Sequence, residues 1–451
     1  MKIGVVNTKS FMTSGYRIDP DIHLSEGAAV RKQLRNLPYE LTNVGECASK
    51  VFLGNIFSRI FVKDKAHGVP YLAASDTVLS NIETGRFLAK KQANELSYLM
   101  LKKDWILITC SGTLGNVTYT NSTFENHLAT HDLIRVVPND VNVNKGTLYA
   151  FLAGKYGYYQ ITQSQFGGVV KHINDAQASS IIVPVLPEQL QKDVNTLIQE
   201  AAILREEATT ALDKAHHMIE DYINFVPHTP THQFNIQNIL NSHTKRFEGS
   251  YYSSECSQVY DHVSKMEHST LKNCVVKIYR PGIFKRQYVK DGVTFLGGAD
   301  ILLAIPDSEK NLSFKQVEQM PELTLKEGWI LVTCGGTIGN TVYVDKQLSK
   351  CAVSQHVIRI VPKEGVKKGF LYAFLSSKVG YKLITRDTYG SVIPQIEPHH
   401  IERIPIPQFP TDLEAEVDEL VMTYANKLSM SKSNERKAIS MVEQEIEKWN
   451  K

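Results

Sequence analysis

The sequence lacks the features that mark membrane-bound and secreted proteins. No apolar run approaches the roughly 20 residues needed to cross a bilayer, and residues 1–15 do not place a basic stretch before an apolar one as a signal peptide does. The six cysteines show no C-x-x-C spacing and no matching histidine pair, so no zinc site is predicted. We therefore expect a cytoplasmic protein with reduced thiols. Cys110 and Cys334 lie in apolar runs and are predicted to be buried.

The sequence also has little net charge and none of the common catalytic motifs. A formal net charge of +3 is too small to indicate a polyanion partner by itself. There is no G-x-x-x-x-G-K-[ST] phosphate loop, no H-E-x-x-H, no Asn/Asp-Pro-Pro-aromatic motif of amino-methyltransferases and no G-x-G loop after a strand. The pentapeptide 306–310 resembles a PD…ExK nuclease motif only superficially, because that chemistry needs carboxylates on neighbouring strands. We predict no catalytic residue and no metal ligand.

What the sequence does contain is an internal duplication. Residues 103–116 read KDWILITCSGTLGN, and residues 327–340 read EGWILVTCGGTIGN. Their tryptophans, Trp105 and Trp329, are 224 positions apart (329 − 105), which is about half of the chain. Further matched signals follow each copy in the same order, among them LYAFL at 148–152 and at 371–375. A series of this kind indicates a tandem duplication.

Each half is predicted to fold as a globular α+β domain. In the first half, short runs rich in β-branched residues at 105–109, 117–119 and 133–137 are separated by Gly and Asn, which is typical of strands joined by tight turns. The run 148–157 has helical spacing. The mixture favours an α+β fold over a β-sandwich.

Two long amphipathic helices are expected to follow the two domains. From 188 to 223 the apolar residues recur at alternating steps of four and three, as in a coiled-coil seam, and Thr411 opens a T-x-x-E capping box before the second helix. Polar Ser431 and Glu435 interrupt the second seam. We expect the helices to form an antiparallel coiled coil that separates two pseudo-symmetric domains. The predicted domains are residues 1–187 and 226–410, and the predicted helices are residues 188–225 and 411–451. The expected seam includes Met218, Tyr222, Val417, Val421 and Trp449.

Polar and glycine-rich loops occupy the same places in both halves and are the candidate binding sites. Exposed amides of a loop after a strand can contact phosphates, and Gln, Arg, Lys and His can address base edges. The stretch 277–288 interleaves basic and aromatic residues, which is typical of a nucleic-acid surface, whereas its counterpart at 55–65 is less dense in basic residues. Plain turns, ordinary surface loops and a solvated basic face remain the alternatives. The candidate DNA-binding residues are Ser111, Thr113, Asn116, Gln165, Lys171 and His172 in the first half, and Tyr279, Arg280, Lys285, Arg286, Thr337, Asn340, Arg386, Tyr389, Ser391 and Gln395 in the second.

The duplicated motifs follow a characteristic order along the chain. Each half contains W-I-L-[IV]-T-C-x-G-T-[LI]-G-N, then Phe/Tyr-Gly-x-Val, then [IP]-x-[IV]-P and a long helix. In this order and in the Leu-Pro-Glu-Gln sequence at 186–189, the chain resembles the specificity subunit of Type I restriction–modification systems. The second helix departs from that pattern, because residues 409–412 read Phe-Pro-Thr-Asp without the Glu-Gln pair.

The resemblance implies two target-recognition domains that each read one half of a bipartite site in double-stranded DNA. It also implies that the two helices set the gap between the half-sites and dock two modification (methyltransferase) subunits. Those partners would use S-adenosylmethionine, and restriction subunits would use ATP and Mg. The chain itself would bind no cofactor and would be non-catalytic.

Two other functions stay open. A targeting or scaffold subunit with the same fold could serve a defence complex that does not methylate DNA, and the neighbouring genes would distinguish this case. A stand-alone enzyme would need a fused methylase or nuclease motif, which the sequence lacks.

Overall fold

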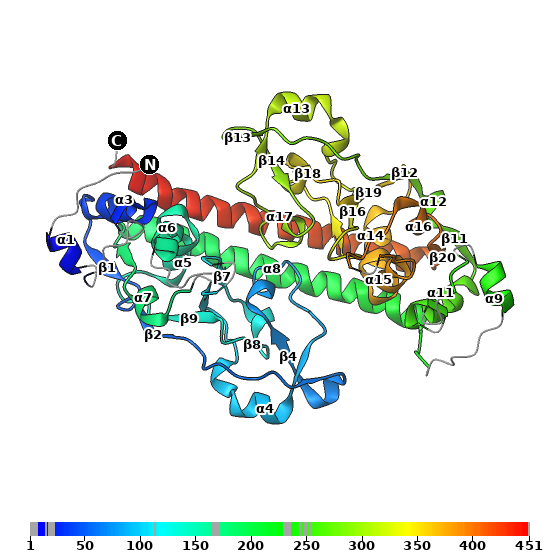
Figure 1. The fold of residues 1–451 in the computed structure, drawn as a ribbon, viewed down its shortest axis with the longest axis horizontal. Coiled ribbons are helices and arrows are strands. Elements are labelled where there is room, and N and C mark those ends of the chain that lie inside the picture. Colours follow the sequence, from blue (N-terminus) through cyan, green and yellow to red (C-terminus); the bar gives the residue numbers. More distant parts are fainter. Residues whose placement is uncertain are drawn as a thin grey trace. The chain divides into compact units, whose positions relative to one another are not determined.

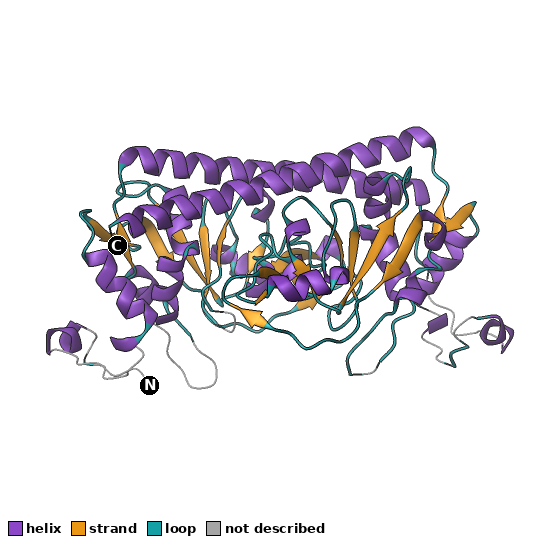
Figure 2. Cartoon of the chain, turned by 90° about the horizontal axis from the view of Figure 1, so that it is seen from above, coloured by secondary structure: helices purple, strands orange, loops and turns teal. Residues whose placement is uncertain are grey.

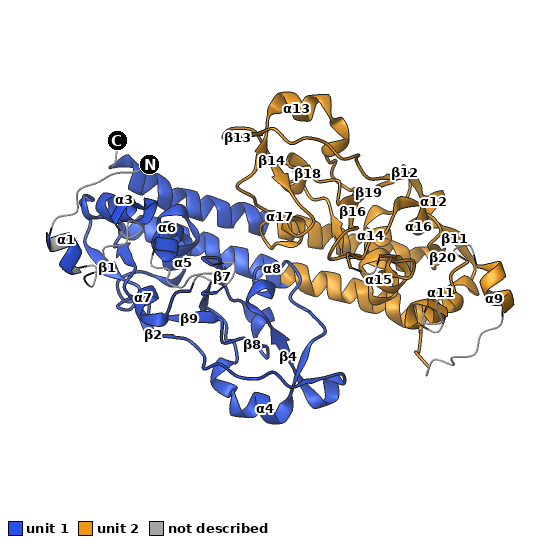
Figure 3. Ribbon diagram, in the orientation of Figure 1, with its two compact units in different colours: residues 1–206, 430–451 blue, residues 207–429 orange. Residues whose placement is uncertain are grey.

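The chain forms two compact units (Figure 3). The computed structural model describes residues 8–13, 16, 23–111, 114–163, 172–228, 236–242, 245–247, 251–252, 254–390 and 392–449. Unit 1 comprises Met1–Glu206 with Met430–Lys451, and unit 2 comprises Glu207–Ser429. Each unit thus includes part of both long helices, and the division into two domains and two helices predicted above stays a prediction. No helix in these described ranges is long and apolar enough to span a membrane.

Unit 1 contains two four-stranded sheets and a two-stranded ladder (Figure 1). Its strands are β1 (Leu41–Asn43), β2 (Ala48–Phe52), β3 (Phe61–Val62), β4 (Gly68–Leu72), β5 (Phe87–Ala89), β6 (Ile106–Thr109), β7 (Val117–Tyr119), β8 (Leu128–Ala129), β9 (Leu133–Pro138) and β10 (Ile182–Pro184). The first sheet has the order β2-β9-β6-β7 and is antiparallel. The second has the order β3-β5-β4-β8, in which β4 and β8 are parallel. β1 pairs with β10.

Unit 2 repeats this topology strand for strand. Its strands are β11 (His268–Thr270), β12 (Val275–Tyr279), β13 (Tyr288–Val289), β14 (Val293–Leu296), β15 (Asn311–Leu312), β16 (Ile330–Thr333), β17 (Thr341–Tyr343), β18 (Ala352–Val353), β19 (Val357–Pro362) and β20 (Pro405–Pro407). The sheets have the orders β12-β19-β16-β17, β13-β15-β14-β18 and β11-β20. Even the register shift after the first residue pair of β2 and β9 recurs between β12 and β19. The predicted duplication and α+β class are confirmed.

The central strands β6 and β16 each begin with three apolar residues in a row, because both of their faces are buried. Side chains alternate between the two faces of a strand. In β6, Ile106 and Ile108 belong to one core, and Leu107 belongs to a second core. The same division holds for β16, where Leu331 lies in the second core. A short, continuous apolar run is the expected signature of a strand covered on both faces.

Short helices complete each unit. In unit 1 they are α1 (Thr8–Thr13), α3 (Glu26–Arg35), α4 (Lys90–Glu95), α5 (Lys145–Ala153), α6 (Lys155–Gln163) and α7 (Asp175–Ser179), with 3-10 turns η1 (Lys65–His67), η2 (Ala74–Asp76), η3 (Ser97–Leu99) and η4 (Ser122–Phe124). In unit 2 they are α9 (Ile236–Asn241), α11 (Glu255–Ser264), α12 (Leu271–Cys274), α13 (Phe314–Gln319), α14 (Lys368–Ser376), α15 (Lys378–Thr385) and α16 (Pro398–Ile401), with η5 (Asp300–Leu302), η6 (Pro321–Leu323) and η7 (Leu348–Lys350). The prediction of one helix over 148–157 is wrong in one respect, because Gly154 interrupts the helix and separates α5 from α6.

Two long helices run antiparallel within each unit. α8 spans Glu188–Ile223, and α17 spans Thr411–Lys448. Unit 1 holds the beginning of α8 with the end of α17, and unit 2 holds the end of α8 with the beginning of α17. In unit 2, Glu207 pairs with Lys427 (2.7 Å) and Lys214 pairs with Glu416 (2.8 Å). Residue numbers along α17 therefore fall as those along α8 rise. In each unit the sheets lie on one side of this helix pair (Figure 2). The predicted antiparallel pairing is confirmed.

The seam differs from its prediction near the helix ends. Tyr222 and Trp449 were expected to be buried, but they are 38% and 47% exposed, whereas Ile219 and Ile223 are buried. The reason is that these ends of the helices also pack on the cores of the two units. Ile219 and Ile223 of α8 belong to the core of unit 2, and Ile446 of α17 belongs to the core of unit 1, so a different helix face is buried there. The polar Ser431 does lie in the seam, where it is fully buried and its Oγ donates to the carbonyl of Ala201 (2.7 Å).

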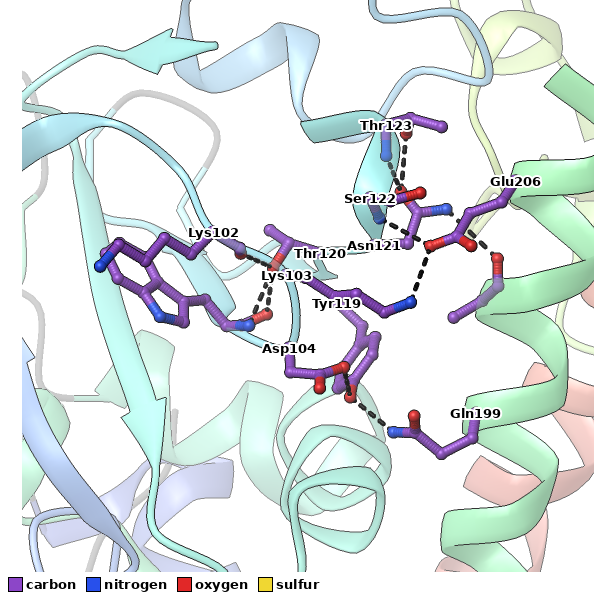
Figure 4. A network of polar contacts seen from close by, with 12 residues as sticks. Lys102, Lys103, Asp104, Tyr119, Thr120, Asn121, Ser122, Thr123, Gln199 and Glu206 are labelled. Carbon is purple, nitrogen blue, oxygen red and sulfur yellow. Dashed lines mark hydrogen bonds and ion pairs between the residues drawn. The ribbon is translucent and has the colours of Figure 1, made fainter. Parts of the chain in front are cut away.

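In unit 1, polar contacts attach α8 to the base of the β6–β7 hairpin (Figure 4). The N–H of Ser122 donates to Glu206 (2.7 Å), which also pairs with Lys103 (3.3 Å). Gln199 donates to the hydroxyl of Tyr119 (2.6 Å). These contacts lie before β6 and at or just after the last residue of β7, at the end of the hairpin remote from its connecting loop. The two strands that flank the loop are therefore attached to α8.

Candidate nucleic-acid interface

The loop that connects β6 to β7, and its counterpart between β16 and β17, are closed by the same hydrogen bonds. In unit 1 the N–H of Thr109 donates to the carbonyl of Asn116 (2.9 Å), and the N–H of Asn116 donates to Thr109 Oγ1 (3.0 Å). In unit 2, Thr333 and Asn340 form the same two bonds at 3.0 and 3.1 Å. Gly339 has a φ of +83°, and a Cβ there would lie 2.5 Å from Thr385, so this turn requires glycine. The predicted Asn116 and Asn340 thus close the loops with their backbones, and their contact with DNA stays a prediction.

Three chain segments meet beside the loop of unit 1. Ser111 and His172 form an isolated antiparallel bridge. The N–H of Cys110 donates to the carbonyl of Asp132 (3.4 Å), and the N–H of Ile173 donates to the carbonyl of Cys110 (3.2 Å). The structure therefore brings together the predicted residues Ser111 and His172. Thr113, Gln165 and Lys171 lie outside the described residues.

The equivalent segments meet in the same way in unit 2. The N–H of Cys334 donates to the carbonyl of His356 (3.1 Å), and the N–H of Ile396 donates to the carbonyl of Cys334 (3.2 Å). Gly335 forms an isolated bridge with Gln395. The backbone frame is thus shared by the two units, while the side chains that line it differ.

In unit 2 this frame carries a polar network around Glu397. Tyr389 and Gln395 exchange two backbone hydrogen bonds, at 3.0 and 2.8 Å. The hydroxyl of Tyr389 donates to Glu397 (2.9 Å), and Arg280 forms an ion pair with the same carboxylate (2.6 Å). Burial and then the hydrogen bond to Glu397 raise the pKa of Tyr389, so its hydroxyl stays a donor. The carboxylate of Glu397, which was not predicted, therefore joins the predicted residues Arg280 and Tyr389. Tyr389 in turn holds the predicted Gln395. Ser391 lies outside the described residues.

Arg386 has an interior position. Its side chain is 11% exposed, and its guanidinium lies 3.9 Å from the ring centroid of Tyr260 and 4.9 Å from that of Tyr251. Its Nε donates to Ser257 Oγ (3.4 Å). Cation–π contacts of this kind stabilise a desolvated arginine. The arrangement favours a structural role for Arg386, and its predicted contact with DNA stays untested.

The remaining predicted residues of unit 2 lie on or beside exposed loops. Thr337 is exposed in the loop after β16, and Lys285 and Arg286 are exposed between β12 and β13. Tyr279, at the end of β12, is half-buried, with the ammonium of Lys277 3.9 Å from its ring centroid. Its contact with DNA, like those of Thr337, Lys285 and Arg286, stays a prediction.

Sequence reasoning missed a pair of equivalent buried arginines, Arg135 and Arg359. The guanidinium of Arg135 donates to the carbonyls of Ala129 (2.9 Å), Thr130 (3.1 Å) and Leu133 (2.9 Å). Arg359 donates to the carbonyls of the matching segment, and burial lowers the pKa of each arginine to about 10. These arginines hold the backbone of residues 129–133 and 354–357, which link the second sheet of each unit to the first. The repeated Ile-Arg at 134–135 and 358–359 was the available signal.

The two cysteines at equivalent positions of the repeats lie in the interior. Cys110 and Cys334 are buried, which confirms the prediction, and burial raises the pKa of Cys110 to about 12. Within the part of the chain that the structure describes, no three His, Cys, Asp or Glu side chains are grouped to hold a metal ion.

Comparison with known proteins gives one family and a set of distant structural relatives. The family model described as "Type I restriction modification DNA specificity domain" matches residues 42–204 and 269–415. The specificity subunit of the Type I restriction enzyme MjaIX from Methanocaldococcus jannaschii is 24% identical over 142 residues, which are 32% of this chain and 32% of that protein. The chain thus matches about a third of the length of this curated relative.

Two solved structures align with most of the chain at low identity. An S subunit of a Type I restriction–modification system from M. genitalium is 13% identical, with 92% of this chain and 96% of that chain covered and a TM-score of 0.36. The HsdS subunit from Thermoanaerobacter tengcongensis is 11% identical, with 90% and 97% covered and a TM-score of 0.29.

Proposed function

Because this chain belongs to the Type I restriction modification DNA specificity domain family, we propose that it is the non-catalytic specificity subunit of a Type I restriction–modification complex. Unit 1 and unit 2 would each bind one half of a bipartite site in double-stranded DNA. The observation that carries the proposal is the duplicated site: the loops after β6 and β16 are closed by the same bonds, whereas the side chains around them differ. One frame with two sets of polar side chains suits the recognition of two different half-sites.

The duplication also has an energetic purpose in this proposal. A good base contact contributes about 1–3 kcal/mol of discrimination, so one small domain distinguishes few base pairs. Two linked domains add their contributions without a second association cost.

The proposed partners are double-stranded DNA, two modification (methyltransferase) subunits docked on α8 and α17, and restriction subunits. S-adenosylmethionine, ATP and Mg would be used by those subunits, in the cytoplasm, and not by this chain. The absence of methylase, helicase-type and nuclease motifs from the sequence supports this division of labour.

Mapping methylated adenines across the source genome tests the proposal, with the gene intact, deleted and restored. We expect one bipartite motif to lose methylation on deletion and to regain it on restoration. If no motif changes, the chain does not direct a methylase, and a targeting or scaffold role in a non-methylating defence complex takes its place.

A further inference from the structure

Each unit carries an exposed isoleucine on a loop between its two sheets. The loop 53–60 connects β2 to β3, and the loop 280–287 connects β12 to β13. Ile56 is 87% exposed and Ile283 is 94% exposed. Full burial of an isoleucine contributes about 1.5–3 kcal/mol to folding, which neither residue provides to its own unit.

The two loops share a short sequence motif. Residues 56–59 read Ile-Phe-Ser-Arg and residues 283–286 read Ile-Phe-Lys-Arg, with a separation of 227 positions (283 − 56). The residues just before the isoleucine differ between the copies, whereas Val62-Lys63 and Val289-Lys290 extend the match downstream at the same separation. The exposed isoleucine therefore belongs to a short stretch that is shared by both halves.

The Phe and Arg of the motif attach each loop to its unit. In unit 1, the guanidinium of Arg59 lies 5.9 and 5.8 Å from the ring centroids of Phe57 and Tyr71, and its Nε donates to the Tyr71 hydroxyl (2.6 Å). In unit 2, the guanidinium of Arg286 lies 5.9 and 5.5 Å from the ring centroids of Phe284 and Phe295.

A glutamine clamps the backbone of each loop in the same way. Gln92 accepts from the N–H of Ile60 (2.9 Å) and donates to the carbonyl of Ser58 (2.5 Å). In unit 2, Gln316 accepts from the N–H of Gln287 (2.9 Å) and donates to the carbonyl of Lys285 (2.8 Å). Both loops are therefore anchored directly after the isoleucine, at residues 57–60 and 284–287, and the isoleucine itself stays exposed.

The loops lie beside the candidate interface, and the loop of unit 2 is strongly basic. Arg59 donates to Thr130 Oγ1 (3.0 Å) and lies 3.7 Å from Asp132, whose carbonyl accepts the N–H of Cys110 at the start of the candidate loop. Arg286 donates to Gln355 (3.3 Å), which precedes His356 at the equivalent place. Residues 280–290 include four basic residues, Arg280, Lys285, Arg286 and Lys290, and no acidic residue. A rigid apolar tip in a basic setting matches the bases and phosphates of a nucleic acid better than the apolar face of a protein.

We infer that Ile56 and Ile283 make direct apolar contacts with DNA bases, one in each half-site. The inference rests on the proposed function and adds a specificity determinant to it. Apolar side chains contact thymine methyl groups in the major groove or enter base steps from the minor groove, and either contact depends on the base pair that it meets.

The test uses the complex purified through a tag on the full-length chain, with two duplexes of equal composition, one containing the mapped site and one scrambled. We expect Ile56→Ser and Ile283→Ser each to weaken binding to the specific duplex roughly five- to hundredfold, with unchanged binding to the scrambled duplex. Each variant should relax the base preference in one half-site only. Neither change removes buried apolar area, so both variants should fold, and Ile56→Val should keep most of the affinity.

Matched controls are Val141→Ser in unit 1 and Val226→Ser in unit 2, since both valines are 74% exposed; neither control should alter binding. Isoleucine variants that bind both duplexes like these controls would overturn the inference. Loss of a protein subunit from the purified complex, with DNA affinity intact, would also overturn it and assign the loops to a protein partner. If the unaltered complex does not distinguish the two duplexes, the proposed function fails and the inference falls with it.

Discussion

Arg205 and Glu435 form a largely buried ion pair inside unit 1, with 2.6 Å between Nη2 and Oε2 and side-chain exposures of 15% and 5%. The hydroxyl of Tyr149 donates to the other oxygen of the same carboxylate. Burial is the largest single influence and would lower the pKa of Arg205, but the charge of Glu435, the Tyr149 hydroxyl and the hydrogen bond to Glu435 together outweigh burial and raise the pKa, so the arginine stays charged. The polar interruption in the seam of α17 is therefore the point where that helix is joined to both α8 and α5.

Removing one member of this pair should destabilise unit 1. Arg205→Leu or Glu435→Leu leaves an unpaired charge in the interior, and we expect a loss of about 3–5 kcal/mol. The double variant should lose less than the sum, because no charge remains uncompensated. Denaturant unfolding, with amide hydrogen exchange in 430–448 as the local measure, checks this. The control is Glu188→Gln, because the side chain of Glu188 is 82% exposed. If the single leucine variants are as stable as this control, the prediction is wrong.

Arg386 should matter for stability more than for recognition. Its guanidinium lies between two tyrosine rings, and lysine cannot reproduce that planar contact. We expect Arg386→Lys to destabilise unit 2 by about 1–2 kcal/mol and to leave the methylated motif unchanged. Thermal unfolding and methylation mapping provide the two measures. A changed half-site at unchanged stability would instead support the direct DNA contact predicted from the sequence.

Gln395 should affect one half-site alone. It bridges Gly335 and pairs with Tyr389 within the interface of unit 2, and glutamine can bond bidentately to adenine. We expect Gln395→Ala to relax the base preference at one position of one half-site, as read from methylation patterns. Gln319→Ala, an exposed glutamine on α13, should leave the motif intact. An unchanged motif in the Gln395 variant would remove this residue from recognition.

The length of the helices should set the gap between the half-sites. A heptad adds about 10 Å to a helix, close to the rise of about three base pairs. We expect a heptad inserted after Ala208 in α8 alone to abolish activity or alter the gap, because the pairing with α17 is displaced. A second heptad after Ala425 in α17 should restore pairing and lengthen the gap by about three base pairs. A motif with the original gap would exclude the helices as the ruler.

His216 should make the stability of unit 2 depend on pH. Its Nε2 lies 2.8 Å from Ser376 Oγ, and burial lowers its pKa from 6.5 to about 4. The unfolded chain therefore binds a proton that the folded chain refuses between these values, and stability falls as the pH drops from 6.5 to about 4. The loss should reach about 3 kcal/mol. Denaturation midpoints across this range should flatten in His216→Gln and keep the wild-type slope in the exposed control His217→Gln.

The sequence was sufficient to predict the features that local patterns encode. The repeat around Trp105 and Trp329 predicted two copies of one α+β fold, and the heptad spacing predicted two long helices whose seams pair. Within each copy, the strand and helix patterns depend only on neighbouring residues, since these periodicities are short.

The features that were missed depend on partners remote in the chain. In the sequence, Glu435 only interrupts an apolar seam, because its partner Arg205 lies 230 positions away. The interior position of Arg386 could not be predicted, because the tyrosines that it contacts belong to a different segment of the chain. The motif at 56–59 and 283–286 is present in the sequence, but the exposure of its isoleucine depends on the folded loop and is not encoded in the local pattern.

Unit 2 is one uninterrupted stretch of chain, whereas unit 1 is assembled from both ends. The borders of unit 2 fall inside α8 and α17, where the two units share continuous helices. A single stretch of gene therefore encodes every sheet and the whole core of unit 2, and both of its ends lie in regions that encode the long helices. Recombination between related genes can replace that half in one event, with no new junction inside either globular core, so the chain has the construction of an exchangeable cassette.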